Sequence, residues 1–361
     1  MNPNVETRST VRRKNKYYYK HLGDFRRELR ETIPVELLRE LHRPVAWRHF
    51  ALVLRQLGIA LLTIGLVLRF DSPWLWFPGS VILGFIAFDF TVLLHEVIHN
   101  AIFAKKRPLG NAVLGWLYSL PSGISRTQFT RWHLDHHEEL GSWTDDPKRA
   151  HLTPKIVERW YKFLYMTPAL FPIYFRAAAM EAQNYSPELR RIIQIERWVT
   201  IGLHLAVMGG LIGSAGFWGF FKVYAVPYFF IFPVAFTINR LGQHYRVNPQ
   251  DVAQWTTLMR GSLFWDFAFL YSNYHLEHHY FPAVPCYRLP ELQKLLQPLY
   301  ARHGMQPQTY GKILYGWFIE NQSPHTDWSA TGGSGADGSR DNGENEEPMP
   351  SPRLSFPSQM S

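Results

Sequence analysis

The chain has 361 residues, of which 46% are hydrophobic, 16% aromatic and only 19% charged. This composition excludes a disordered or fibrous protein and provides ample apolar side chains for a large core. The formal net charge is +9, but six acidic residues and two arginines lie from Asp327 onward, which leaves +13 on residues 1–326. A basic body of this kind suits nucleic acid, anionic lipid or a phosphorylated substrate.

Cysteine is nearly absent from the chain, whereas histidine is abundant. The single cysteine, Cys286, excludes an internal disulfide bond, a cysteine-based zinc site and an iron–sulfur cluster. Sixteen histidines are present. Any bound metal is therefore expected to have nitrogen rather than sulfur ligands.

Composition divides the chain into three parts. Residues 1–49 contain twelve Lys and Arg against six acidic residues. The first thirty residues lack the apolar stretch of a cleaved signal peptide, so none is expected. We expect a basic N-terminal segment here. Residues 50–325 contain the long apolar runs and are expected to form a membrane domain. Residues 326–361 are rich in Ser, Gly, Asn, Glu and Pro and predict a disordered tail.

Four apolar stretches in the central part are candidate membrane spans, at residues 50–70, 74–94, 199–221 and 223–238. About twenty residues of helix cross a hydrocarbon core of ~30 Å. We place the break between the last two stretches at Lys222. Buried helices of a soluble protein are the alternative, but adjacent and nearly uncharged stretches of this length are uncommon there. Shorter apolar runs at 109–120 and 160–174 predict interfacial or buried helices.

An even number of spans returns the chain to the side on which it starts. The basic segment 1–49 marks that side as cytoplasmic by the positive-inside rule. We therefore predict an all-α integral membrane protein with four transmembrane helices and a cytosolic helical cap. Both termini are expected in the cytoplasm, and no nucleic-acid partner is expected.

Histidines occur in three clusters of short spacing, with one isolated histidine between the second and the third cluster. The clusters are His95-Glu96-x-x-His99, His133-x-x-His136-His137 and His275-x-x-His278-His279, and the isolated residue is His244. Random placement of sixteen histidines would produce about 0.03 copies of H-x-x-H-H. Because positions i, i+3 and i+4 share one helix face, we expect each triple to direct its imidazoles at one point.

The clusters lie where the predicted topology brings them into one layer at the cytoplasmic face. His95 and His99 end the second span, and His244 follows the fourth. Eight or nine neutral imidazoles exceed the needs of one ion, because a zinc site takes four ligands. They suit two metal ions, and imidazole accepts iron, zinc, copper or nickel.

These motifs resemble the three histidine boxes of the membrane fatty acid desaturase and hydroxylase superfamily, from about Phe50 to His279. The resemblance implies a non-haem di-iron centre that uses O2 to attack an unactivated C–H bond. The implied metal ligands are His95, His99, His133, His136, His137, His275, His278 and His279, with His244 at the place of a ninth histidine found in the family. Arg240 stands where some members add an asparagine ligand.

The resemblance implies desaturation of the acyl chain of a fatty acid or lipid. Hydroxylation or ketolation of a lipid or carotenoid on the same scaffold is the alternative. No H-P-G-G motif of a fused cytochrome b5 and no G-x-G-x-x-G dinucleotide motif occurs in the chain. Electrons are therefore expected from a separate ferredoxin-, rubredoxin- or cytochrome b5-type donor.

Two other functions fit part of the pattern. His95-Glu96-x-x-His99 matches the zinc-protease motif with Glu96 as general base, but it leaves both H-x-x-H-H triples unexplained. A metal transporter or sensor predicts ligands along the membrane pathway rather than in one layer. Within the boxes, Glu96, Asp135 and Glu277 are candidates to orient ligand rings. Histidines in charged stretches, such as His49 and His303, are expected at the surface.

Overall fold

The computed structural model describes residues 16–323. The predicted disordered tail, 326–361, and the first fifteen residues of the basic segment lie outside the described residues. Within 16–323 all regular structure is helical, apart from an isolated bridge between Met259 and Gln308. The prediction of an all-α chain is confirmed for this range.

Among residues 16–323, three helical stretches are long and apolar enough to cross a membrane. Their mean hydropathies are 2.1, 2.0 and 1.6, and they are α4 (Ala46–Arg69), α5 (Pro73–Ile98) and the continuous stretch Pro187–His244. The third consists of α10 (Pro187–Phe220), the π-helix η2 (Phe221–Ile231) and α11 (Phe232–His244).

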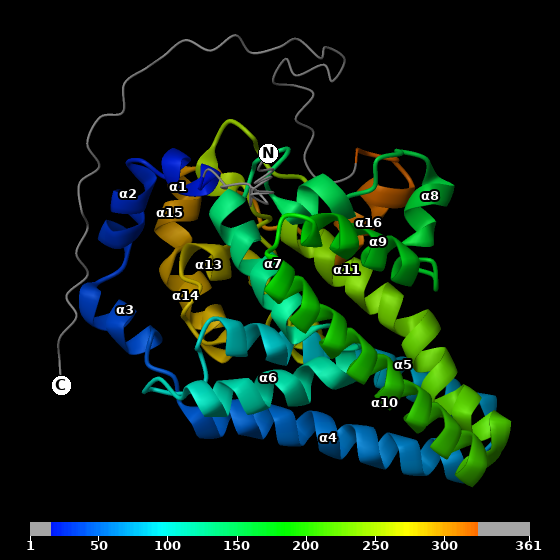
Figure 1. Ribbon diagram of the computed structural model, residues 1–361. Helices are drawn as coiled ribbons and strands as arrows, with labels where there is room; N and C mark the ends of the chain where they lie inside the picture. The colour runs from blue at the N-terminus through cyan, green and yellow to red at the C-terminus, as the bar shows by residue number, and fades with distance from the viewer. Residues whose placement is uncertain (1–15, 324–361) are drawn as a thin grey trace, which may run out of the picture. The chain divides into compact units, whose positions relative to one another are not determined.

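Helix α5 lies at the centre of this bundle. It packs against α4, η2 and α11 (Figure 1), and 61% of its most apolar window is buried, compared with 17% for α4. The outer face of α4 exposes Leu54, Leu61 and Leu62. A continuous apolar face of this kind suits a lipid environment.

The third stretch reverses at Gly216 rather than at Lys222. Gly216 has φ 70° and ψ 174°, a conformation that glycine adopts without a Cβ clash. After this residue η2 packs back against α10. Helical structure continues through Lys222, so the predicted boundary between residues 221 and 223 is wrong.

The buried Lys222 ties the two helical hairpins together. Its Nζ donates hydrogen bonds to the Val67 carbonyl (2.8 Å) and to Asp71 Oδ1 (2.7 Å), close to the turn between α4 and α5. A charged side chain inside an apolar stretch is retained because these oxygens satisfy its ammonium.

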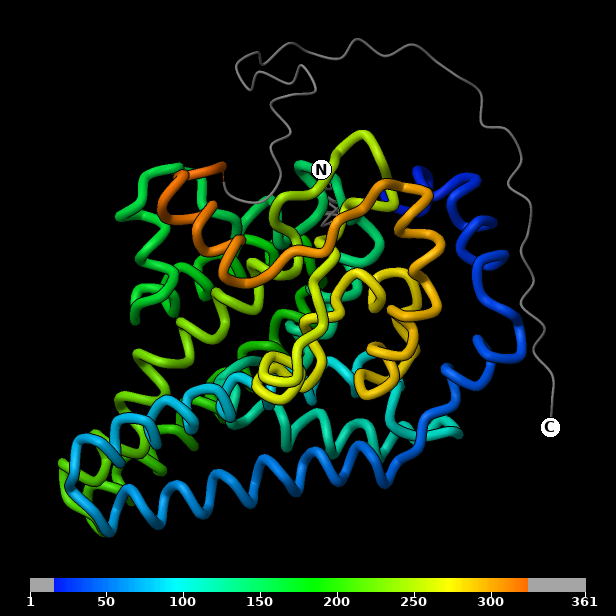
Figure 2. The backbone as a smooth tube through the Cα atoms, turned by 180° about the vertical axis from the view of Figure 1, so that it is seen from behind, coloured from blue at the N-terminus to red at the C-terminus, as the bar shows by residue number. Residues whose placement is uncertain are grey.

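The shorter helices gather around the C-terminal end of α5, away from the turn that follows α10 (Figures 1 and 2). Between α5 and α10 they are α6 (Pro108–Ser122), α7 (Arg126–Glu139), the π-helix η1 (Lys148–Leu152), α8 (Arg159–Leu164) and α9 (Leu170–Ala182). After α11 they are η3 (Val252–Gln254), α12 (Leu263–Ala268), α13 (His275–Tyr280), η4 (Cys286–Arg288), α14 (Leu289–Leu295), α15 (Gln297–Arg302) and α16 (Tyr310–Phe318).

The N-terminal helices α1 (Tyr17–His21) and α2 (Phe25–Thr32) pack on this helical cap, and α3 (Val35–Leu41) contacts it through the ion pair of Glu40 with Arg288 (3.8 Å). The Glu139 carboxylate accepts hydrogen bonds from the backbone N–H groups of Lys16 and Tyr17 at the start of α1. His303, which follows α15, lies between Glu28 Oε2 (3.0 Å) and Asp251 Oδ2 (2.9 Å). These contacts connect the end of α15 to α2 and to the start of η3. Most of the basic segment is therefore structured.

Two of the histidines expected at the surface have structural roles. His303 is held between the two carboxylates, and His49 is buried with its Nε2 2.9 Å from the Tyr118 hydroxyl. The surface expectation is wrong for His49, whereas His303 remains partly exposed, because burial and partners depend on chain segments far away in the sequence.

The contact of His303 with Glu28 and Asp251, which connects α15 to α2, is expected to weaken as pH rises. Burial alone would lower the pKa of His303, but the hydrogen bonds and charges of Glu28 and Asp251 outweigh it and raise the pKa above 6.5. The resulting stability is complete below the ordinary pKa and is lost as pH rises through the raised value. Hydrogen exchange of α2, corrected for intrinsic rates, should increase over that range, whereas a His303→Gln variant should exchange fast at every pH. Equal protection in both proteins would contradict this contact.

Candidate metal centre

Nine histidines converge in two groups at the cap end of α5. One group contains His95, His99, His133, His137 and His278, and the other contains His136, His244, His275 and His279. Within each group the facing ring nitrogens lie within 4.8 Å of one another. The second group is buried throughout, whereas His95 and His99 of the first are half-buried. The nine histidines singled out from the sequence are the nine that meet here.

Each H-x-x-H-H triple divides between the two groups instead of pointing at one centre. On α7, His133 and His137 contribute to the first group and His136 to the second. On α13 the division is reversed, because His278 joins the first group and His275 and His279 the second. Positions i and i+4 are separated by about 40° around a helix and i+3 lies on the other side of i. The three histidines of one triple therefore spread far enough around the helix to reach two adjacent sites.

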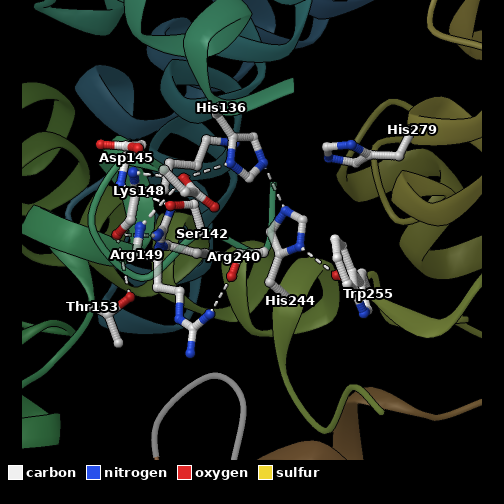
Figure 3. A network of polar contacts seen from close by, with 12 residues as sticks. His136, Ser142, Asp145, Lys148, Arg149, Thr153, Arg240, His244, Trp255 and His279 are labelled. Atoms are coloured by element: carbon white, nitrogen blue, oxygen red, sulfur yellow. Dashed lines mark hydrogen bonds and ion pairs between the residues drawn. The ribbon is translucent and has the colours of Figure 1, made fainter. Parts of the chain in front are cut away.

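In two histidines of the second group, a hydrogen-bond acceptor determines which ring nitrogen carries the proton. His136 Nδ1 lies 2.8 Å from Asp146 Oδ1, and His244 Nδ1 lies 3.3 Å from the Trp255 carbonyl (Figure 3). Each partner accepts a hydrogen bond, so each Nδ1 carries the proton and each Nε2 carries a lone pair. The two Nε2 atoms are 2.9 Å apart. Two lone pairs facing at this distance repel unless a cation lies between them, so the residues fit a bound metal ion.

The remaining ring contacts repeat this inward arrangement. In the first group, Nε2 of His99 lies 2.7 Å from Nε2 of His133, and Nε2 of His137 lies 3.0 Å from Nε2 of His278. In the second group, Nε2 of His275 lies 3.2 Å from His244 and 3.1 Å from His279. Imidazoles ordinarily bind metal through one ring nitrogen and donate through the other. Both groups have the donor chemistry for one ion each.

Burial keeps these imidazoles neutral. Desolvation, with nearby cationic groups adding to it, lowers the pKa of His99 to about 3. The same causes place the pKa well below its ordinary value in His133, His136, His137, His275, His278 and His279. Metal ligation requires the neutral form. The site is therefore prepared for a cation without the release of histidine protons at neutral pH.

Among the carboxylates inside the boxes, Glu96 faces a ligand ring, with its Oε1 4.0 Å from His95 Nδ1. Glu96 accepts a hydrogen bond from the Cys286 N–H (2.9 Å), Glu277 accepts from Tyr300 and Gln293, and Asp135 pairs with Arg131. The carboxylate that contacts a box histidine at 2.8 Å is Asp146, which sequence reasoning missed. The signal was the Asp145-Asp146-Pro147 turn ten residues after His136.

A pocket opens beside the histidines. Its metal-facing wall contains His95, His133, His275 and His278, and Phe88, Phe129, Trp132 and Phe236 supply apolar walls. A second apolar pocket shares Thr91, Phe129, Tyr174 and Phe236 with it and extends to Phe171 and Phe232. The shared residues place the two pockets side by side, and histidines of both groups line the first pocket.

A family model described as fatty acid desaturase matches residues 71–311, a range that includes both histidine groups. This match covers more than half of the chain. The chain belongs to the fatty acid desaturase family. The predicted resemblance is confirmed.

Relatives of this desaturase-family chain include sphingolipid enzymes. It is 27% identical over 306 residues to the sphingolipid delta(4)-desaturase/C4-monooxygenase DES2 of Homo sapiens, over 82% of this chain and 87% of that protein. It is 26% identical over 291 residues to the sphingolipid delta(4)-desaturase DES1 of Drosophila melanogaster, over 76% and 81%. The DES1 of Xenopus tropicalis is 26% identical over 320 residues, over 84% and 90%.

Family membership establishes the class of activity. The protein is a membrane oxidoreductase of the oxygen-dependent desaturase type, and its substrates are lipid chains. Members of the family generally use two iron ions, and the two histidine groups supply nitrogen ligands for a metal. The zinc-protease interpretation of His95 and His99 is excluded.

Proposed function

We propose that this protein holds two iron ions between its nine histidines and introduces a double bond into the hydrocarbon chain of a lipid. The division of nine inward-facing imidazoles into groups of five and four supports this proposal. A site for one ion needs three or four protein ligands, so two adjacent groups of this size suit two ions. Bound iron would supply the activation of O2 that attack on an unactivated C–H bond requires.

The chain's own residues position both reactants. Asp146 holds the ring proton of His136 on Nδ1, and the Trp255 carbonyl does the same for His244, so both Nε2 atoms remain available as ligands. The aromatic walls at Phe88 and Phe236 exclude water and hold an apolar chain against the ligand layer. Which carbon reacts is determined by how far the chain can slide along this wall.

We propose a sphingolipid as the first substrate class to test, because the relatives in Homo sapiens and Xenopus tropicalis are named for reaction at position 4 of a sphingolipid. Hydroxylation at the same carbon is the second candidate, since the human relative is also named a C4-monooxygenase. Both reactions begin with removal of hydrogen from the same chain.

The proposal includes a membrane arrangement and an electron source. We propose that α4, α5 and the two parts of Pro187–His244 on either side of Gly216 each cross the bilayer. The basic residues of 1–49 then place the cap, the histidines and both termini in the cytoplasm. A separate ferredoxin-, rubredoxin- or cytochrome b5-type protein would deliver the electrons there.

Lipid profiling tests the reaction. Cells that express the wild-type protein should contain a lipid with one additional double bond or hydroxyl group that is absent from cells with a His136→Ala variant at matched membrane levels. The position of the new group identifies the reaction, and the head group identifies the substrate class. Identical lipid profiles in the presence of saturated sphingolipids and a functional donor would contradict the proposal.

A further inference from the structure

One wall of the pocket beside the histidines is polar and carries two cationic side chains. Lys148 on η1 and Arg240 on α11 line it together with Asn239, Gln243 and Ser272. The three uncharged residues satisfy one another, because Asn239 donates to Ser272 and accepts from Gln243. Positive charge in an otherwise aromatic pocket is costly unless it has a function or a partner.

The backbone of Lys148 is held on both sides. Its N–H donates to Asp146 Oδ1 at 3.0 Å, which is the oxygen that also accepts from His136. Its carbonyl accepts from Arg240 Nη2 (3.3 Å) and from the backbone N–H (3.1 Å) and hydroxyl (3.2 Å) of Thr153 (Figure 3). A π-helix such as η1 is often found at a functional site. Lys148 is thus anchored to the same network that orients a ligand ring.

The ammonium group of Lys148, in contrast, has no hydrogen-bond acceptor and no carboxylate within ion-pair distance among residues 16–323. Desolvation and the Arg240 charge lower the pKa of Lys148 to about 7, against the opposing effect of Asp146. The Lys148 charge also contributes to the lowered pKa of His99 in the first group and of His275 in the second. Lys148 therefore lines the same pocket as histidines of both groups, and its ammonium has no protein acceptor among residues 16–323.

We propose that the Lys148 ammonium binds an oxygen atom at the polar end of the lipid substrate and thereby determines which carbon faces the histidines. The inference rests on the proposed function and adds the position of the substrate to it. The apolar extension toward Phe171 and Phe232 takes the hydrocarbon tail. Because Lys148 and four box histidines line one pocket, an oxygen bound by Lys148 brings the neighbouring carbons of the chain beside the histidines.

The chemistry required of the substrate is an oxygen acceptor next to a saturated chain. A hydroxyl, an amide carbonyl or a phosphate oxygen meets this requirement, and a sphingolipid carries the first two within four carbons of its head. A fatty acyl chain that reacts near its middle would leave the Lys148 ammonium without an acceptor. The polar wall therefore favours reaction close to the head group.

Charge removal at Lys148 tests the inference. Lys148→Met retains the apolar stem and removes the ammonium, whereas Lys148→Arg retains the positive charge. Lys155→Met is the matched control, because this exposed lysine donates to the Arg149 carbonyl (3.1 Å), lies over the Trp143 ring and is outside the pocket lining. The iron content of each purified variant should equal that of the wild type, which separates substrate binding from metal assembly.

The probes are a saturated N-acyl sphingoid base, its analogues without the hydroxyl groups, and a saturated phospholipid. Wild-type protein should prefer the probe that carries the acceptor oxygen, and Lys148→Met should raise KM for it about 10- to 100-fold, in line with loss of a hydrogen bond to a charged group. The kcat should change less, the double bond should appear at several positions, and Lys148→Arg should restore one position.

Direct binding keeps this inference separate from the proposed function. Native mass spectrometry of the same probes measures lipid retention without turnover. If the wild type converts no probe but still binds the oxygen-bearing lipid more tightly than Lys148→Met does, the proposed reaction is wrong and the binding role of Lys148 is supported. Unchanged discrimination between the probes in Lys148→Met, in both binding and KM, would overturn the assignment of Lys148. An adverse effect of equal size in Lys155→Met would also overturn it.

Discussion

His136→Ala and His278→Ala are each expected to abolish product and to remove one of two irons, not both. His278 belongs to the group of five histidines and His136 to the group of four. Loss of one imidazole leaves an open coordination sphere in its own group, and even a residue that only orients a ligand alters metal affinity or activity about 10- to 100-fold. The other group retains all of its nitrogens.

Metal analysis of the purified variants checks this expectation beside the lipid assay. His42→Ala serves as a control for histidine loss, since His42 ends α3 and its Nδ1 lies 2.7 Å from the Leu38 carbonyl, outside both groups. Matched membrane expression is required because loss of a metal ligand also destabilises a fold. Wild-type product from either box variant would contradict the metal assignment.

Asp146→Asn is expected to weaken iron binding at the four-histidine group about 10- to 100-fold while leaving the fold intact. The asparagine oxygen can still accept from the N–H groups of Lys148 and Arg149, as the Asp146 carboxylate does at 3.0 and 3.4 Å. The negative charge beside the His136 ring is lost, so the ring becomes a weaker donor to a metal.

Iron titration monitored separately from thermal stability measures this effect. Asp24→Asn is the control, because Asp24 is exposed and pairs only with Arg27 on the surface of α2. An Asp146→Asn protein with wild-type iron affinity would show that the hydrogen bond at 2.8 Å between Asp146 and His136 does not tune the site.

Much of the architecture could be predicted because it depends on local patterns. Apolar runs of the right length placed α4 and α5 to within a few residues of 46–69 and 73–98. The histidine spacings selected eight of the nine residues that meet in the structure, and the place after the last apolar run selected His244. Hydrophobic length and i, i+4 spacing are properties of a segment, so the sequence alone contains them.

The other features depend on segments that meet only in the folded chain. The reversal at Gly216 was not predicted because several glycines of the same stretch, such as Gly209 and Gly213, look equivalent in sequence. The division of each triple between two groups depends on the relative rotation of α7 and α13. Asp146 and Lys148 were missed because their roles depend on the π-helix η1 and on the Arg240 contact to it.

Elemental analysis of the purified wild-type protein, combined with oxygen uptake in the presence of electron donor and saturated lipid, tests the central claim most directly. The two histidine groups predict about two irons per chain and oxygen consumption that depends on the lipid. A single tightly bound zinc per chain, with no lipid-dependent oxygen uptake, would contradict a di-iron desaturase.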